Sequence, residues 1–182
     1  MTTGATVSIR RGSVPDAEAV ARLHIASWRA TYAAELPAWY LEALDPASRA
    51  AQWRERIELP GVRMLLATAG GDPLGFAAYG PSRDRDLDPS DWCQLYNFHV
   101  DPARRSRGVG ARLWHAMMAD LTSGGFSGLT LWVVPTNGGA RRFYERMGLR
   151  ADGTEQHENL APGAGFQEIR YRGSFEEMTT GA

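Results

Sequence analysis

One segment of the chain has the residue types and the order that suit a bound diphosphate. The sequence RSRGVG, residues 105–110, lies between a predicted strand and a predicted helix. Unpaired backbone N–H groups and the dipole at a helix start favour negative charge there. Gly108 and Gly110 lack a Cβ and let a ligand approach the main chain, while Arg105 and Arg107 add charge-assisted donors. The segment therefore predicts a diphosphate-binding loop.

Two other nucleotide-binding motifs do not match the sequence. The chain has no GK[ST] tripeptide of a P-loop, and no three-glycine fingerprint follows an N-terminal strand. P-loop folds and dinucleotide-binding folds are therefore excluded.

A second segment, residues 135–149, predicts a helix that carries a tyrosine. Its sequence is PTNGGARRFYERMGL, in which Asn137 is a favourable N-cap and Gly148 a favourable C-cap. Tyr144 lies inside the helix predicted over 137–147. Its phenol can donate a hydrogen bond or a proton to a leaving group, and the simpler alternative is a tyrosine of the core.

Together the two segments resemble the GCN5-related N-acetyltransferase (GNAT) superfamily, whose acetyl-CoA motif is [QR]xxGxG/A between a central strand and its helix. The resemblance extends from Val7 to Arg172. It implies an N-acetyltransferase that uses acetyl-CoA as its acyl donor, with the main chain of the strand end pairing with the pantetheine arm. The cofactor-binding residues that the resemblance implies are Phe98, His99, Val100, Arg105, Ser106, Arg107, Gly108, Val109, Gly110, Ala111, Asn137, Ala140 and Phe143.

The resemblance also implies that Tyr144 is the catalytic residue, beside the CoA sulfur. Aminolysis of a thioester expels a thiolate, and a phenol with a pKa of about 10 can hydrogen-bond to a thiol with a pKa of about 8.5, or protonate it. Direct attack by the amine predicts ternary-complex kinetics. The alternative is acyl transfer through Cys93, which has no neighbouring His or Lys in the sequence to lower its pKa.

The base that deprotonates the amine stays open at this point. Several relatives have a glutamate six residues before the strand-end valine, where this chain has Gln94, and a neutral amide cannot take up a proton. A water relay is the first choice, and the alternatives are Glu35, His99 and His157. Two further histidines, His24 and His115, are expected to be structural.

The acceptor site is expected where the first helices meet the sheet. Aromatic side chains gather over residues 28–40, a region that frames the acceptor pocket in the resembling family, and helix packing is an equal alternative. The acidic loop over 84–91 could attract a cationic amine if it borders the cleft. The candidate substrate residues are Trp28, Tyr32, Glu35, Tyr79, Gln94, Asn97 and Trp132.

The hydrophobic pattern predicts alternating strands and helices in a single domain over 1–182, with tails at 1–6 and 174–182. Strands are predicted near 7–11, 63–69, 74–80, 92–100, 129–134, 149–153 and 165–172, and helices from Ala17, Trp39 and Pro46 and over 109–123 and 137–147. Hairpins plus one strand–helix–strand crossover indicate the α/β class. The resemblance implies a mixed, mostly antiparallel sheet of about six to seven strands with about four to five flanking helices.

Composition limits the partners of the chain. The 20 Lys and Arg residues are balanced by 21 Asp and Glu residues, so neither nucleic-acid nor membrane binding is expected. No run approaches the ~20 apolar residues of a membrane span and no signal peptide is seen, so a cytoplasmic location is expected. A single cysteine excludes an intramolecular disulfide and a multi-cysteine zinc site, and no metal is expected.

The sequence thus predicts acetyl transfer from acetyl-CoA to an amine, with a small-molecule amine as the first choice of acceptor. The alternatives are a protein N-terminus or lysine, or a CoA-binding sensor without turnover, which Gln94 favours. The resemblance also allows a homodimer formed through the last strands.

Overall fold

The computed structural model describes residues 6–105 and 107–180, which form one sheet with helices on both faces. The strands are β1 (Ser8–Arg11), β2 (Arg63–Ala69), β3 (Asp72–Pro81), β4 (Trp92–Val100), β5 (Gly128–Val133), β6 (Arg150–Ala161) and β7 (Ala164–Ser174). The helices are α1 (Ala17–Thr31), α2 (Ala38–Glu42), α3 (Pro46–Glu58), α4 (Val109–Ser123), α5 (Gly138–Arg146) and α6 (Phe175–Thr180), with 3-10 turns η1 (Val14–Asp16) and η2 (Pro102–Arg104).

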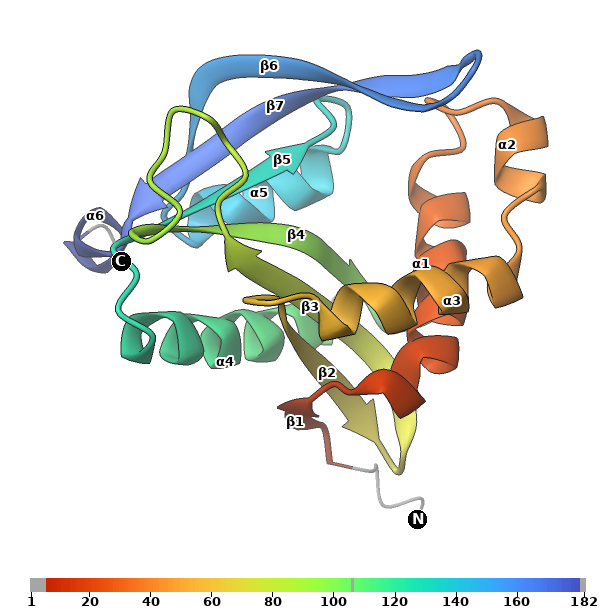
Figure 1. Ribbon diagram of the computed structural model, residues 1–182, viewed down its shortest axis with the longest axis horizontal. Coiled ribbons are helices and arrows are strands. Elements are labelled where there is room, and N and C mark those ends of the chain that lie inside the picture. The colour runs from red at the N-terminus through yellow and green to blue at the C-terminus, as the bar shows by residue number, and fades with distance from the viewer. Residues whose placement is uncertain (1–5, 106, 181–182) are drawn as a thin grey trace.

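The described strands form a seven-stranded sheet in the order β1-β2-β3-β4-β5-β7-β6. β4 and β5 pair in parallel, and every other neighbouring pair is antiparallel. In Figure 1, α1, α2 and α3 gather on the right, whereas α4 and α5 lie on the left. The predicted mixed, mostly antiparallel α/β sheet is therefore confirmed.

The central strands are buried on both faces because their alternate side chains enter two different cores. In β2, Met64 and Leu66 pack with residues of α1 and α3, whereas Leu65 and Ala67 pack with residues of α4. Helices from both halves of the chain thus hold the sheet in place and fix the ends of its strands.

Local sequence signals set the ends of several helices and strands. The Oδ1 atom of Asn137 accepts the Ala140 N–H at 3.2 Å and caps α5, while Gly148 follows this helix with a φ of +93°. The predicted GGDP turn joins β2 to β3, with Gly70 and Gly71 at positive φ. These caps and turns form as the sequence predicts.

The C-terminal part differs most from the prediction. β6 extends to Ala161, well beyond the predicted 149–153, and pairs with β7 as a long hairpin. The segment expected as a tail is helical as α6, and its Phe175 and Met178 pack against the main core. The added apolar contacts explain why this polar segment is ordered.

Candidate functional site

The sheet splits in its middle, between β4 and β5. β4 pairs with β3 as far as Val100, but its pairing with β5 stops at Leu95 opposite Leu131. A bulge at Tyr96 shifts the register with β3 at the same point, and bulges bend the strand that carries them. In Figure 1, β4 and β5 lie side by side at one end and separate toward the right. The β5 side of residues 97–100 therefore lacks a strand partner and can pair with an extended ligand.

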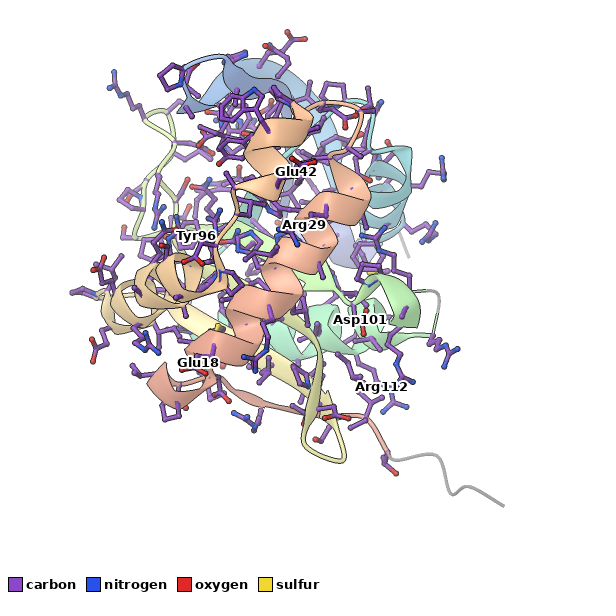
Figure 2. The ribbon with its side chains drawn as sticks, turned by 90° about the vertical axis from the view of Figure 1, so that its right-hand side faces the viewer. Glu18, Arg29, Glu42, Tyr96, Asp101 and Arg112 are labelled. Atoms are coloured by element: carbon purple, nitrogen blue, oxygen red, sulfur yellow. The ribbon has the colours of Figure 1, made fainter. Side chains whose placement is uncertain are left out.

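A cleft of about 760 Å³ opens at this split and is lined by residues of α1, α3, β4, α4, β5, α5, β6 and β7. In Figure 2, β4 passes behind α1, with Tyr96 on one side of this helix and Asp101 on the other. The part of the cleft beside Val100, Gly108 and Tyr144 is called the α4 half. The part that includes Tyr96 and the cleft-lining residues of α3 is called the α3 half.

Most of the predicted cofactor residues line the α4 half. They are Phe98, His99, Val100, Arg105, Gly108, Val109, Gly110, Ala111, Asn137, Ala140 and Phe143. Arg107 does not line the cleft and is exposed, and Ser106 lies outside the described residues. Arg104 and Arg146 line the cleft as well. The basic side chains of the cleft therefore include two that the motif did not indicate.

The start of α4 has the backbone geometry of an anion site. Gly108 is the N-cap and has a φ of +78°, a value that favours glycine. A Cβ at Gly108 would meet no atom within 4 Å, and one at Gly110 would make only ordinary contacts with Phe98, Val100 and Phe143. The conformation of the loop, rather than crowding, therefore requires glycine at position 108. Arg105 is tied to α1, since its guanidinium donates to the Thr31 Oγ1 at 2.8 Å.

Tyr144 lies on α5 at the deep end of the α4 half. Its ring is buried, 5.6 Å from the Phe143 ring and 6.4 Å from the Phe98 ring between centroids. Burial raises the pKa of Tyr144 above its ordinary value, so the phenol keeps its proton at neutral and mildly alkaline pH. Within residues 6–105 and 107–180 its hydroxyl forms no hydrogen bond, although it lines the cleft. The hydroxyl is thus available to a ligand.

Two neutral histidines, His24 and His99, line the cleft. The Nδ1 of His99 is 3.0 Å from the Ser27 Oγ, and the Nδ1 of His24 accepts the Trp53 Nε1–H at 3.2 Å. Their rings are 4.7 Å apart. Burial lowers the pKa of His99 to about 3 and that of His24 well below its ordinary value. A histidine with so low a pKa is a poor base at neutral pH.

The predicted acceptor residues divide into those that line the cleft and those that do not. The former are Trp28, Tyr32, Gln94, Asn97 and Trp132. Tyr79 points to the other face of the sheet, because strand side chains alternate, and its hydroxyl donates to the Asp120 Oδ2 at 2.7 Å. Glu35 lies outside the lining, where it accepts a hydrogen bond from Thr136. Tyr79 and Glu35 are therefore not placed as the sequence predicts.

Three arginines that the sequence analysis did not single out line the α3 half. They are Arg49, Arg56 and Arg83, whose Cζ atoms lie 5.4, 5.5 and 3.9 Å from the ring centroids of Trp28, Trp53 and Tyr96. In the described part of the chain, none of the three forms an ion pair. One face of α3 carries residues 49, 53 and 56, at positions i, i+4 and i+7. This helical spacing is the sequence signal that could have indicated Arg49 and Arg56.

The comparison with known proteins identifies the family. Residues 26–149 match the model described as the acetyltransferase (GNAT) family. The chain belongs to this family. It is 30% identical over 131 residues to the uncharacterized N-acetyltransferase YuaI of Bacillus subtilis (strain 168), covering 72% of this chain and 73% of YuaI. The resemblance stated from the sequence and the acyltransferase class are thus confirmed.

Solved GNAT structures have the same fold. The PaiA N-acetyltransferase of Thermoplasma acidophilum, in complex with coenzyme A, matches with a TM-score of 0.73 and 16% identity over 93% of this chain and 99% of PaiA. YncA of Salmonella typhimurium, with its cofactor acetyl-CoA, matches with a TM-score of 0.70 and 18% identity over 93% of this chain and 94% of YncA.

The base expected of this GNAT enzyme is not found among the side chains that the sequence offered. The Oε1 of Gln94 accepts the Arg83 N–H at 2.9 Å, and His157 is exposed outside the cleft. Glu168 of β7 lines the cleft, is half-buried, and accepts a hydrogen bond from the Gln156 Nε2 at 2.8 Å. Burial, and in smaller part the charge of Glu158, raises the pKa of Glu168.

Cys93 is not placed to carry an acyl group in this GNAT fold. It is fully buried and outside the cleft lining. Burial raises the pKa of its thiol to about 12, so the thiolate that acyl transfer needs is scarce at neutral pH.

The acidic loop is bound to the sheet rather than turned toward the cleft. Arg170 pairs with Asp86 and with Asp152 at 2.7 Å each, while Asp84 accepts the Thr130 Oγ1–H and the Trp132 Nε1–H at 2.9 Å. No residue from 84 to 91 lines the cleft. The expectation that this loop attracts a cationic amine is therefore not supported, because none of its residues borders the cleft and Asp84 and Asp86 are used in structural contacts.

Within residues 6–105 and 107–180, no group of three or more His, Cys, Asp or Glu side chains could hold a metal ion. None of the described helices has the length and apolar character needed to cross a membrane.

Proposed function

We propose that this GNAT enzyme transfers an acetyl group from acetyl-CoA to the amine of a small-molecule acceptor, by direct attack in a ternary complex. The observation that carries the proposal is the continuous cleft, which joins the start of α4, the split between β4 and β5, and the α3 half. A donor in the α4 half and an acceptor in the α3 half meet beside Tyr144.

The residues of the α4 half fit the parts of acetyl-CoA. The start of the 15-residue α4, with Gly108 at positive φ, suits the pyrophosphate. The backbone of 97–100 suits the amide-bearing pantetheine arm, because it has no strand partner on the β5 side. Two GNAT neighbours of the same fold were crystallised with CoA or acetyl-CoA. When bound, acetyl-CoA supplies a thioester carbonyl that an amine can attack.

Tyr144 assists the departure of the thiolate. A bond forms between the amine nitrogen and the acetyl carbon, and the C–S bond breaks with its electron pair on sulfur. The hydroxyl of Tyr144, which has no hydrogen-bond partner in residues 6–105 and 107–180, donates a hydrogen bond to this sulfur and protonates it, and the tyrosinate regains a proton from water before the next turnover. Its raised pKa keeps the donor protonated, so Tyr144 acts as the general acid.

Glu168 is the proposed acceptor of the proton that the amine loses, directly or through water. It lines the cleft, whereas Gln94 is neutral and Glu35 faces Thr136. A carboxylate with a raised pKa is a better base near neutral pH than an ordinary one. In Glu168→Gln, we expect kcat to fall and the acidic limb of the pH–rate profile to move. A fall in kcat with an unchanged profile contradicts this role.

The shape of the α3 half supports a small acceptor. The β6–β7 hairpin contributes Leu160, Phe166 and Glu168 to the wall that faces α1 and α3. Phe166 stacks on Tyr32 with ring centroids 5.1 Å apart, which joins the hairpin to α1. Walls on both sides suit a compact ligand better than a folded protein surface.

Release of free thiol from acetyl-CoA, measured with a panel of small amines and of peptides, tests the proposal. We expect turnover with at least one class of small amine. Turnover with peptides alone contradicts the small-molecule acceptor, and tight CoA binding without turnover on any amine favours a sensor.

A further inference from the structure

We propose that the acceptor is an amine that also carries a carboxylate or phosphate group, and that Arg49, Arg56 and Arg83 bind this anionic group. The inference rests on the proposed function, because it assigns the chemical class of the acceptor to the α3 half. It starts from three guanidinium groups that line one cleft and have no carboxylate partner in residues 6–105 and 107–180.

Arg54 of α3 and Arg63 of β2 provide a contrast with the arginines of the cleft. Arg54, also on α3, pairs with Glu18 at 3.2 Å, and Arg63 pairs with Asp120 at 3.1 Å. Both lie outside the cleft lining. Arg49 and Arg56 lie on the same helix as Arg54 but on the face that borders the cleft. Arg49 and Arg56 thus differ from Arg54 in bordering the cleft without an ion pair among the described residues, while other arginines without one, such as Arg85 and Arg142, lie outside the cleft lining.

The three guanidinium groups lie close enough to affect one another. Desolvation, and then the charges of Arg49 and Arg83, lower the pKa of Arg56, whereas the charge of Glu158 raises it in smaller part. Like charges gathered in this way repel one another. A bound carboxylate or phosphate adds to the relief that water and Glu158 already give, since Arg56 and Arg83 are exposed.

Stacking holds these side chains in a form that suits an anion. Arg83 lies 3.9 Å above the Tyr96 ring, and Arg49 and Arg56 lie over Trp28 and Trp53. A guanidinium that covers a ring with its flat face leaves the N–H groups at its edge free to bind oxygen atoms in pairs. The rings therefore restrict the arginines, and Arg49 also donates one N–H to the Gln52 Oε1 at 3.2 Å.

Carboxylates that an amine can meet come from the β6–β7 hairpin. Glu158 and Glu168 both line the cleft, and the charge of Glu158 acts on Arg56, whereas that of Glu168 acts on Tyr32. A carboxylate attracts an ammonium group and repels an anion. An acceptor with both groups can meet carboxylates with its amine and arginines with its anion, whereas a polyamine would meet the arginines unfavourably.

Matched pairs of acceptors test this inference directly, since each pair differs only in the anionic group. L-phenylalanine is compared with L-phenylalaninamide for the carboxylate, and O-phosphoethanolamine with ethanolamine for the phosphate, with spermidine as a polycation. We expect the anionic member of at least one pair to have a kcat/KM at least about tenfold higher, as for one charge-assisted contact. The pair that responds distinguishes carboxylate from phosphate.

Variants assign the effect to the arginines. Arg83→Gln and Arg56→Gln should each raise KM for the preferred anionic amine by about tenfold and leave that of acetyl-CoA unchanged. Arg54→Gln, on the same helix but paired with Glu18, is the matched control and should change neither constant. Equal turnover of both members of each pair, a preference for spermidine, or an equal loss for charged and neutral amines overturns the inference.

A binding measurement separates this inference from the proposed function. If no amine releases thiol, the proposed function fails, and calorimetry of O-phosphoethanolamine and L-phenylalanine with CoA present still decides the inference. Saturable binding that weakens in Arg83→Gln supports the anion site. Absence of binding by both compounds contradicts it.

Discussion

The two halves of the cleft are built in different ways. The α4 half depends on backbone: a helix start, a glycine at positive φ, and a strand end without a partner. The α3 half depends on side chains from α1, α3, β4, β6 and β7, which lie far apart in the sequence. The contrast suggests that recognition of a common donor can be held in a short motif, whereas recognition of the acceptor arises only from the packed fold.

Tyr144→Phe gives the largest expected effect, because Tyr144 is the proposed general acid. Loss of a general acid should lower kcat by about 100-fold. Its hydroxyl has no partner in the described residues, so the melting temperature should stay the same.

Tyr171→Phe is the matched control for that variant. The Tyr171 hydroxyl donates to the Glu145 Oε1 at 2.7 Å and accepts from the Arg141 Nε at 3.1 Å, outside the cleft. Its loss should lower stability by about 1 kcal/mol and leave kcat unchanged. Equal effects of the two variants on kcat contradict a special role for Tyr144.

Gly108→Ala tests whether the α4 half depends on backbone conformation. Gly108 and Gly125 lie before and after α4, with φ values of +78° and +83° and no atom within 4 Å of an added Cβ. Alanine at either position should cost about 1–2 kcal/mol of stability. Only Gly108→Ala should also raise KM for acetyl-CoA, by about tenfold, because only Gly108 lines the cleft. An unchanged KM for acetyl-CoA in Gly108→Ala would show that this glycine is not needed for donor binding.

The difference between the halves also explains what the sequence could predict. Gly108, Asn137 and Tyr144 belong to local patterns of capping and helix spacing, so the α4 half and the central strands were predictable. Tyr79 was assigned to the wrong face, since the one-residue alternation along β3 places it with Ala77 on the α4 side of the sheet. β6 is polar and mostly exposed along its length, so no hydrophobic pattern marks a strand of 12 residues.

The residues missed in the α3 half share a physical reason. Arg83 and Glu168 are 85 positions apart along the chain and line the same cleft only after the sheet has formed. The helical spacing of Arg49 and Arg56 can be seen in the sequence. That pattern alone does not show whether this face of the helix borders a cleft or solvent.

The pH dependence of stability tests the neutral histidines that line the cleft. The pKa of His99 is about 3 when folded and about 6.5 when unfolded, so below pH 6.5 the unfolded chain binds more protons. Stability should therefore fall as pH drops from 6.5 toward 3. Urea unfolding at several pH values should show that the free energy of unfolding falls less with decreasing pH in His99→Asn than in the parent protein. In His115→Asn, a change at an exposed position, the free energy of unfolding should fall with pH as much as it does in the parent protein.

The smallest effect is expected in the acidic loop, which belongs to neither half. Asp88 is exposed and accepts hydrogen bonds from Ser90 within the loop. Asp88→Asn should leave KM unchanged for every acceptor, including spermidine. An increase in KM for cationic amines alone would show that this loop contributes to the acceptor site.

Initial rates with acetyl-CoA and the preferred amine both varied test most directly that the two halves act at the same time. The account predicts intersecting double-reciprocal lines, and an unchanged pattern in Cys93→Ala, because that thiol is buried with a pKa of about 12. Parallel lines that depend on Cys93 would show acyl transfer through the protein and contradict the account.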